Sequence, residues 1–321
     1  IAILPKLYSS LGWQGLMSFL RIARQINSSS VSPHLTVEQW CRQTNQSSRI
    51  ISQLWVPLCL AIMNTPISQA SASVFAATLK DSLAADRQSA DLLIPNKPLG
   101  KVLPEPCNKF ILNQGGEVRL QSRIEKIVID AGKVTGVITS KDEFINTENI
   151  IVAVSPRILH KLLGKQLNLP KVTEFPITTV YLQYSAQFRL KAPIIGLSNS
   201  LSQWIFDRSD QSPGLIAVVI SGPGEHELLT KLQLIEQVIT DLTGILPELP
   251  HHYLATHVIR EKRATFSCGV VDNSQRPSCK TIINGLWIAG DYAENAYPAT
   301  LESAVMNGYR AAENILVGNL P

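Results

Sequence analysis

Residues 285–304 read Gly-Leu-Trp-Ile-Ala-Gly-Asp-Tyr-Ala-Glu-Asn-Ala-Tyr-Pro-Ala-Thr-Leu-Glu-Ser-Ala. The apolar run Leu286–Ala289 predicts a short buried strand that leads into Gly290 and Asp291. An alanine-rich helix is expected over Thr300–Leu316. A helix start has unpaired backbone N–H groups and the positive end of the helix dipole, so this strand, loop and helix could hold an anionic group. The alternative is a strand, loop and helix in which Gly290 serves only as a turn residue.

A second informative stretch, residues 115–127, reads Gly-Gly-Glu-Val-Arg-Leu-Gln-Ser-Arg-Ile-Glu-Lys-Ile. The β-branched runs Ile124–Ile129 and Val134–Thr139 predict a hairpin, because an Asp-Ala-Gly-Lys turn joins them. Further strands are expected at Val118–Leu120 and at Ile150–Val154.

Upstream of these strands, apolar residues at helix-like intervals predict helices over most of residues 1–90. Gly12 and Gly15 are expected to interrupt the first helix, and Pro57 to kink a later one. Thr36, followed three residues later by a glutamine, resembles a capping box.

The second half of the chain predicts mainly strands, at residues 176–184, 203–206, 215–220 and 252–260. An amphipathic helix is expected over residues 225–242. The chain is therefore expected to have a mixed α/β (α+β) fold.

Composition excludes several classes of protein. With 321 residues the chain suggests about two domains, and its net charge of +4 is too small and scattered for a nucleic-acid-binding protein. The five cysteines are widely spaced and form neither CxxC pairs nor zinc-type clusters, so we expect reduced thiols, a cytoplasmic location and no metal site. No apolar run is long enough to predict a membrane-spanning helix.

Taken together, the stretches at 285–304 and 115–127 resemble the FAD-binding signatures of the flavin amine oxidase superfamily, and they occur in the same order. The resemblance implies that the Gly290–Asp291 loop meets the pyrophosphate and ribityl chain, and that the N–H of Leu301 faces the flavin pyrimidine. It also implies that Ile124 holds the adenine through its backbone. Ser303 occupies a position where the superfamily more often has glycine, so tighter packing is expected there. The residues assigned to FAD in this way are Ile124, Ala153, Gly290, Asp291, Thr300 and Leu301.

Other motifs narrow the resemblance. Asn64-Thr-Pro66, Ser89-Ala-Asp-Leu-Leu-Ile-Pro95, Gln203-Trp-Ile-Phe-Asp-Arg208 and Glu261-Lys-Arg-Ala-Thr-Phe266 resemble segments of the hydroxysqualene dehydroxylase family, and the similarity runs along nearly the whole chain. This implies reductive removal of an allylic hydroxyl from hydroxysqualene, with hydride from reduced FAD. The partner implied is an apolar isoprenoid substrate.

Loss of the hydroxyl requires a proton donor. Asp91 and Asp207 are the candidate acids, although each also fits a surface or capping carboxylate, and Tyr297 is placed beside the flavin or in ordinary packing. Amine-oxidising relatives commonly have a lysine on the strand matching residues 175–184; none occurs here, which counts against amine oxidation. A carotenoid-type desaturase and a non-catalytic isoprenoid-binding fragment stay open as alternatives.

The expected organisation has four segments. They are a mainly helical substrate-binding module (1–112), an FAD-domain hairpin and strand (113–160), a mixed α/β substrate domain (161–284) and a C-terminal FAD-binding strand, loop and helix (285–321). The superfamily's GxGxxG turn is absent, since Gly222-Pro-Gly224 lacks the third glycine. We therefore expect the N-terminal FAD lobe to be missing or to lie on another polypeptide.

The N-terminal stretch suggests contact with a membrane surface. Apolar residues between Leu7 and Leu20 are flanked by Lys6, Arg21 and Arg24, a pattern that suits an interfacial helix. The alternative is an ordinary helix packed on the core. If the first interpretation holds, the protein is peripheral on the inner membrane face.

Overall fold

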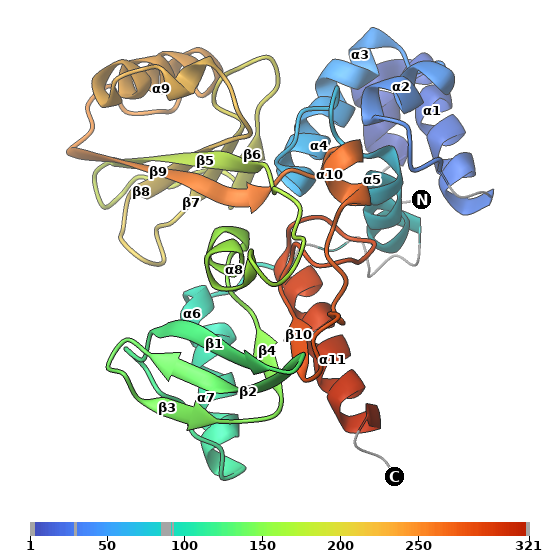
Figure 1. The fold of residues 1–321 in the computed structure, drawn as a ribbon. Coiled ribbons are helices and arrows are strands. Elements are labelled where there is room, and N and C mark those ends of the chain that lie inside the picture. Colours follow the sequence, from blue (N-terminus) through green and yellow to red (C-terminus); the bar gives the residue numbers. More distant parts are fainter. Residues whose placement is uncertain (1–3, 29–30, 85–90, 92, 319–321) are drawn as a thin grey trace. The chain divides into compact units, whose positions relative to one another are not determined.

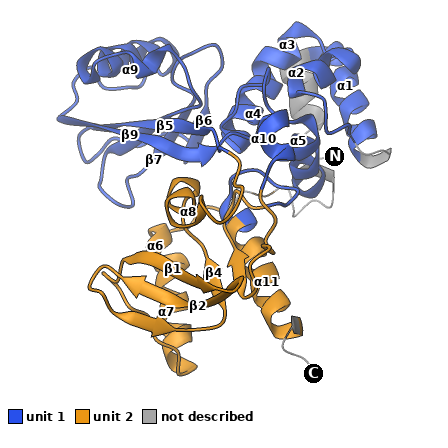
Figure 2. Ribbon diagram, viewed as in Figure 1, with its two compact units in different colours: residues 1–89, 171–276, 294–303 blue, residues 90–170, 277–293, 304–321 orange. Residues whose placement is uncertain are grey.

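The computed structural model describes residues 4–28, 31–84, 91 and 93–318, and it has a mixed α/β fold (Figure 1). The chain forms two compact units, coloured separately in Figure 2. Unit 1 comprises Ile1–Ser89, Lys171–Arg276 and Glu294–Ser303, and unit 2 comprises Ala90–Pro170, Pro277–Ala293 and Ala304–Pro321. Most of the expected helical module and most of the expected mixed α/β segment thus share unit 1. The expected hairpin lies in unit 2 with most of the C-terminal strand, loop and helix.

The N-terminal part of unit 1 is helical. Its elements are α1 (Leu4–Ser28), α2 (Val37–Gln43), α3 (Ser48–Ile50), the π-helical turn η1 (Ile51–Trp55), α4 (Val56–Met63), α5 (Ala72–Leu79) and the π-helical turn η2 (Lys80–Ala84). Gly12 leaves the helical region at φ 69°, as expected, whereas Gly15 is buried inside the helix and does not interrupt it. The irregularity expected at Pro57 takes the form of the π turn just before it. The capping box at Thr36 is confirmed, because the Gln39 N–H donates to Thr36 Oγ1 at 3.2 Å.

The rest of unit 1 is built on a five-stranded antiparallel sheet. Its order is β6 (Ile194–Gly196), β7 (Trp204–Asp207), β8 (Leu215–Ser221), β5 (Glu174–Gln183) and β9 (Ala255–Phe266). Helix α9 (Lys231–Ile245) covers one face, where Val180 and Val218 pack with Leu234 and Val238. The helix begins later than expected because Thr230 caps it, and residues Glu225–Glu227 form the separate 3₁₀ turn η4. A short helix, α10 (Val270–Ser274), follows β9.

Unit 2 contains a three-stranded antiparallel sheet with the order β1 (Ile124–Asp130), β2 (Lys133–Thr139) and β3 (Phe144–Asn146). The β1–β2 turn has positive φ at Ala131 (45°) and Gly132 (78°), as a type I′ turn requires, so the predicted hairpin is confirmed. The strand expected at Val118–Leu120 is wrong. In the described structure this segment joins no sheet, and Arg119 instead forms ion pairs with Glu117 and Glu143.

Among its described residues, two parallel strands and four helices complete unit 2. Strand β4 (Ile150–Val152) pairs with β10 (Leu286–Ile288), and the helices are α6 (Leu99–Val102), α7 (Pro104–Asn113), α8 (Pro156–Leu163) and most of α11 (Leu301–Gly318). The first turn of α11, through Ser303, belongs to unit 1. None of the helices described here is both long and apolar enough to cross a membrane.

Candidate functional site

The parallel strands of unit 2 bring two predicted cofactor positions to one edge. The Ala289 N–H donates to the Val152 carbonyl at 3.1 Å, so Ala153 and Gly290 follow neighbouring strand ends. Ligands of parallel α/β sheets bind beyond the carboxyl ends of the strands. Ala153 is exposed and Asp291 is partly exposed at this edge.

The loop after β10 requires glycine for a local reason. Gly290 has a φ of 144°, and a Cβ added there would lie 2.7 Å from the Tyr292 ring. The buried Asn307 of α11 donates from Nδ2 to the carbonyl oxygens of Gly290 (2.8 Å) and Ala293 (3.2 Å). The loop shape is therefore fixed by the chain itself.

This edge fits the FAD that the sequence implies. The Gly290 loop presents backbone without a Cβ, and Ala153 adds only a methyl group. Asp291 supplies a carboxylate, which accepts hydrogen bonds such as those of a ribityl chain.

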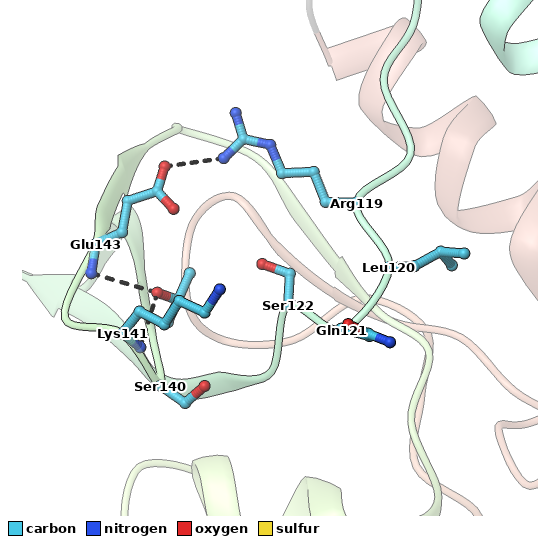
Figure 3. Close-up of a pocket in the computed structure, with 8 residues that line it drawn as sticks. Arg119, Leu120, Gln121, Ser122, Ser140, Lys141 and Glu143 are labelled. Atoms are coloured by element: carbon cyan, nitrogen blue, oxygen red, sulfur yellow. Dashed lines mark hydrogen bonds and ion pairs between the residues drawn. The ribbon is translucent and has the colours of Figure 1, made fainter.

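The adenine position expected at Ile124 lies at the start of β1, opposite Thr139 of β2. Figure 3 shows the polar pocket next to it. Its lining residues are Arg119, Leu120, Gln121, Ser122, Thr139, Ser140, Lys141 and Glu143. Arg119 donates to Glu143 at 2.9 Å across this pocket, so its charge is balanced within the protein.

In unit 1, the start of α11 contains two more expected cofactor residues, Thr300 just before the helix and Leu301 as its first residue. Thr300 Oγ1 accepts a hydrogen bond from the Ser303 N–H (3.1 Å) and donates to the Pro298 carbonyl (3.3 Å). The Thr300 side chain is thus the N-cap of the helix. Leu301, the first helical residue, has a 59% exposed side chain.

Tyr297 has a partner that sequence reasoning missed. Its hydroxyl donates to the Asp81 carboxylate of η2, which is 216 residues away in the chain. The hydrogen bond to Asp81, together with partial burial, raises the pKa of the Tyr297 hydroxyl. No local pattern around Asp81 signals this contact. Tyr297 therefore keeps its proton at neutral pH.

The two candidate acids differ in their surroundings. Asp207, at the end of β7, accepts hydrogen bonds from the N–H groups of Leu190 (2.9 Å) and Ser209 (2.8 Å). Partial burial raises the pKa of Asp207, but these hydrogen bonds outweigh that effect and the pKa falls below its ordinary value. A carboxylate held ionised in this way is a poor proton donor, so the contacts favour the capping role. Asp91 is exposed, and its two neighbours in the chain lie outside the described residues.

The face of the five-stranded sheet opposite α9 has two neighbouring rows of mainly apolar residues, and the next row on this face has Glu261 opposite Ile177. One row is Gly196, Trp204, Val219, Thr179 and Ile259, and the other is Ile194, Phe206, Ala217, Tyr181 and His257. Neither row contains Asp, Glu, Lys or Arg, and every position except Ala217 is at least partly exposed. These two rows can line an apolar ligand.

Comparison with known proteins gives a consistent result. The family model described as flavin containing amine oxidoreductase matches residues 21–316. Hydroxysqualene dehydroxylase of Sinorhizobium fredii is 28% identical over 267 residues, which are 80% of this chain and 60% of that protein. The 15-cis-phytoene desaturase of Narcissus pseudonarcissus is 21% identical over 88% of this chain and 53% of its own length. A solved oxidoreductase from Methanosarcina mazei has the same fold, with a TM-score of 0.75 at 14% identity, over 98% of this chain and 75% of its own.

Proposed function

Because the chain belongs to the flavin-containing amine oxidoreductase family, whose cofactor is FAD, we propose that the protein reduces hydroxysqualene to squalene. The hydroxysqualene dehydroxylases that it resembles support this substrate class. The chain spans about 60% of the length of the first of these relatives.

Two rows without Asp, Glu, Lys or Arg on the sheet of unit 1 carry the proposal. A protonated amine would need a carboxylate or comparable polar partner on the wall of its site, because an unpaired charge is costly to bury. Neither row of this face supplies one, and β5 has no lysine. A long hydrocarbon with a single hydroxyl needs mainly apolar surface, such as Trp204, Phe206 and Ile259.

The reaction replaces a C–O bond by a C–H bond. Reduced FAD supplies the hydride, and the hydroxyl leaves as water once it receives a proton. Tyr297 is suited to orient the hydroxyl by hydrogen bonding rather than to act as the acid, because its pKa is raised. Because hydrogen bonds hold Asp207 ionised, the proposal assigns the role of acid to Asp91.

Product analysis tests the function. The natural protein should convert hydroxysqualene to squalene in the presence of FAD and a reductant, and it should not dehydrogenate phytoene with an electron acceptor. The reverse outcome would favour a desaturase, which the similarity to phytoene desaturases supports as the second candidate. Binding of both isoprenoids without any product would instead identify a non-catalytic isoprenoid-binding protein.

We also propose that α1 contacts a membrane surface, where such a substrate would be collected. Trp13, Met17 and Leu20 lie on one side of the helix and are 65%, 37% and 37% exposed. Phe19 instead stacks on Trp55 in the core, with ring centroids 5.9 Å apart. An exposed apolar stripe on a helix suits the interfacial region of a bilayer.

Liposome flotation with anionic vesicles tests this contact. Replacing Trp13 by Ser should reduce the vesicle-bound fraction without lowering the unfolding temperature. Leu228→Ser is a matched control, because Leu228 is 86% exposed elsewhere in unit 1. Equal loss of binding in both variants, or no binding by the unchanged protein, would remove α1 from the proposal.

A further inference from the structure

No sequence motif predicts the contacts that Arg276 makes with the segment before α11. Its guanidinium lies over the Phe266 ring, 4.8 Å from the centroid. From Nη1 it donates to the carbonyl oxygens of Asn295 (3.0 Å) and Tyr297 (2.7 Å). All of these residues belong to unit 1.

A side-chain network continues from Arg276 to the first turn of α11. The fully buried Ser303 hydroxyl accepts from Asn295 Nδ2 at 2.5 Å and from Arg276 Nη2 at 3.5 Å. Asn295 Oδ1 in turn accepts from the Tyr297 N–H at 2.7 Å. The serine that replaces the usual glycine of the superfamily is therefore a hydrogen-bonding part of this network.

We propose that Arg276, Asn295 and Ser303 are positioning residues that hold residues 295–301 in the conformation required for flavin binding. None of the three needs to touch the cofactor, because they act through the backbone between Asn295 and Leu301. The part of this inference that concerns FAD rests on the proposed function. These three residues form the Arg276 network.

The chemistry of the guanidinium explains why arginine occupies this position. A planar group with five N–H donors reaches two carbonyl oxygens and a hydroxyl while its face rests on an aromatic ring. Lysine has one compact ammonium and cannot reproduce that geometry. Without the network, the segment would have to be ordered when flavin binds, and the ordering would weaken affinity.

The test compares Arg276→Lys with Arg260→Lys in the natural protein. Arg260 is a matched control, because it also donates to carbonyl oxygens within unit 1, those of Leu229 (2.6 Å) and His226 (3.4 Å). Amide hydrogen exchange of residues 294–303 in the flavin-free protein and the dissociation constant of FAD are measured for each. Arg276→Lys should raise the exchange rate of these amides and the dissociation constant of FAD by roughly tenfold each, the effect of losing one charge-assisted hydrogen bond. Arg260→Lys should change neither.

Several outcomes would overturn the inference. Unchanged exchange at residues 294–303 would show that Arg276 does not hold the segment. Faster exchange with unchanged FAD affinity and an unchanged flavin absorbance spectrum would show a purely structural role. An equal loss of FAD affinity in Arg260→Lys would show that the effect is general destabilisation.

Ser303→Ala tests the remaining part of the network. It should also speed exchange and weaken FAD binding, and its effect should be less than additive with that of Arg276→Lys, because residues of one network are coupled. Strictly additive effects of the two substitutions would exclude Ser303 from the network. The exchange measurement needs no substrate, so a protein that yields no squalene but still shows these effects would refute the proposed reaction and leave the network standing.

Discussion

Two loops of the same signature stretch are held in different ways. In unit 2, Gly290–Ala293 takes its shape from a glycine conformation and from Asn307, which lies on helix α11, 14 to 17 residues after the carbonyl groups that it holds. In unit 1, the segment from Asn295 to Tyr297 depends on Arg276, a cation outside the signature that lies on an aromatic ring. One signature stretch can therefore contain a loop that is held by the helix after it and a segment that is held by a residue upstream of the stretch.

The largest expected effect concerns what both loops lack. Neither supplies a GxGxxG turn, and the 321 residues contain none, although that turn is the usual grip on the FAD pyrophosphate. We expect the 321-residue chain, expressed alone, to purify with little or no yellow flavin absorbance. Fusion to a lobe containing that turn should restore the colour. Stoichiometric flavin in the chain alone would mean that the two loops suffice.

The next largest effect should come from Gly290→Ala, which disrupts the Gly290–Ala293 loop. The alanine would have to adopt a φ of 144°, and its methyl group would lie 2.7 Å from the Tyr292 ring. We expect a loss of roughly 2–4 kcal/mol in the free energy of unfolding, measured with urea. Gly308→Ala is the control, since a Cβ there meets nothing within 4 Å and α11 should tolerate it. Similar losses in both variants would contradict this account of the loop.

These loops also show how far sequence reasoning reaches. The β1–β2 hairpin and the Thr36 capping box were predictable because a few adjacent residues encode each of them. Gly290 was identified as special, but its steric requirement comes from Tyr292, two residues away, and not only from a ligand. The predicted start of α9 lies too far upstream, because the apolar pattern continues before Thr230, the residue that caps the start of the helix.

The long-range contacts could not be predicted in this way. The Tyr297–Asp81 hydrogen bond joins residues 216 positions apart, and nothing in either local sequence indicates the other. The same holds for the stacking of Arg276 on Phe266. Asp207 illustrates a different limit, because its residue type fits both an acid and a cap, and only the hydrogen bonds from Leu190 and Ser209 distinguish them.

A smaller effect should distinguish side-chain from backbone binding to FAD. Asp291→Ala in the natural protein should weaken FAD retention by about 1–3 kcal/mol, the range for leaving a buried hydrogen-bonding partner unsatisfied. Leu301→Ala should change it much less, because the expected contact of Leu301 uses its N–H and its side chain is 59% exposed. Titration of flavin-free protein with FAD measures both. Equal affinity of Asp291→Ala and the unchanged protein would exclude Asp291 from the site.

The smallest expected effect is the pH dependence of the Tyr297–Asp81 contact. Because Asp81 and partial burial raise the pKa of Tyr297, folding favours the neutral hydroxyl. Its contribution to stability is complete below the pKa of an unfolded tyrosine, about 10, and is lost as the pH rises through the higher folded value. The unfolding temperature of the unchanged protein should therefore exceed that of Tyr297→Phe by a constant amount from pH 7 to about 9, and the difference should shrink above about pH 10.

Comparison of variants isolates this effect from other titrating groups. Tyr184, whose pKa burial raises to about 12, and Tyr292, whose pKa burial also raises, are present in both proteins, so their contributions cancel in the difference. Asp81→Asn should abolish most of the alkaline dependence that Tyr297 contributes, because it removes the largest cause of the raised pKa. Tyr309→Phe, at a 70% exposed position of α11, controls for the loss of any tyrosine hydroxyl. A difference between unchanged protein and Tyr297→Phe that stays constant to pH 11 would show that Asp81 does not hold the Tyr297 hydroxyl in solution.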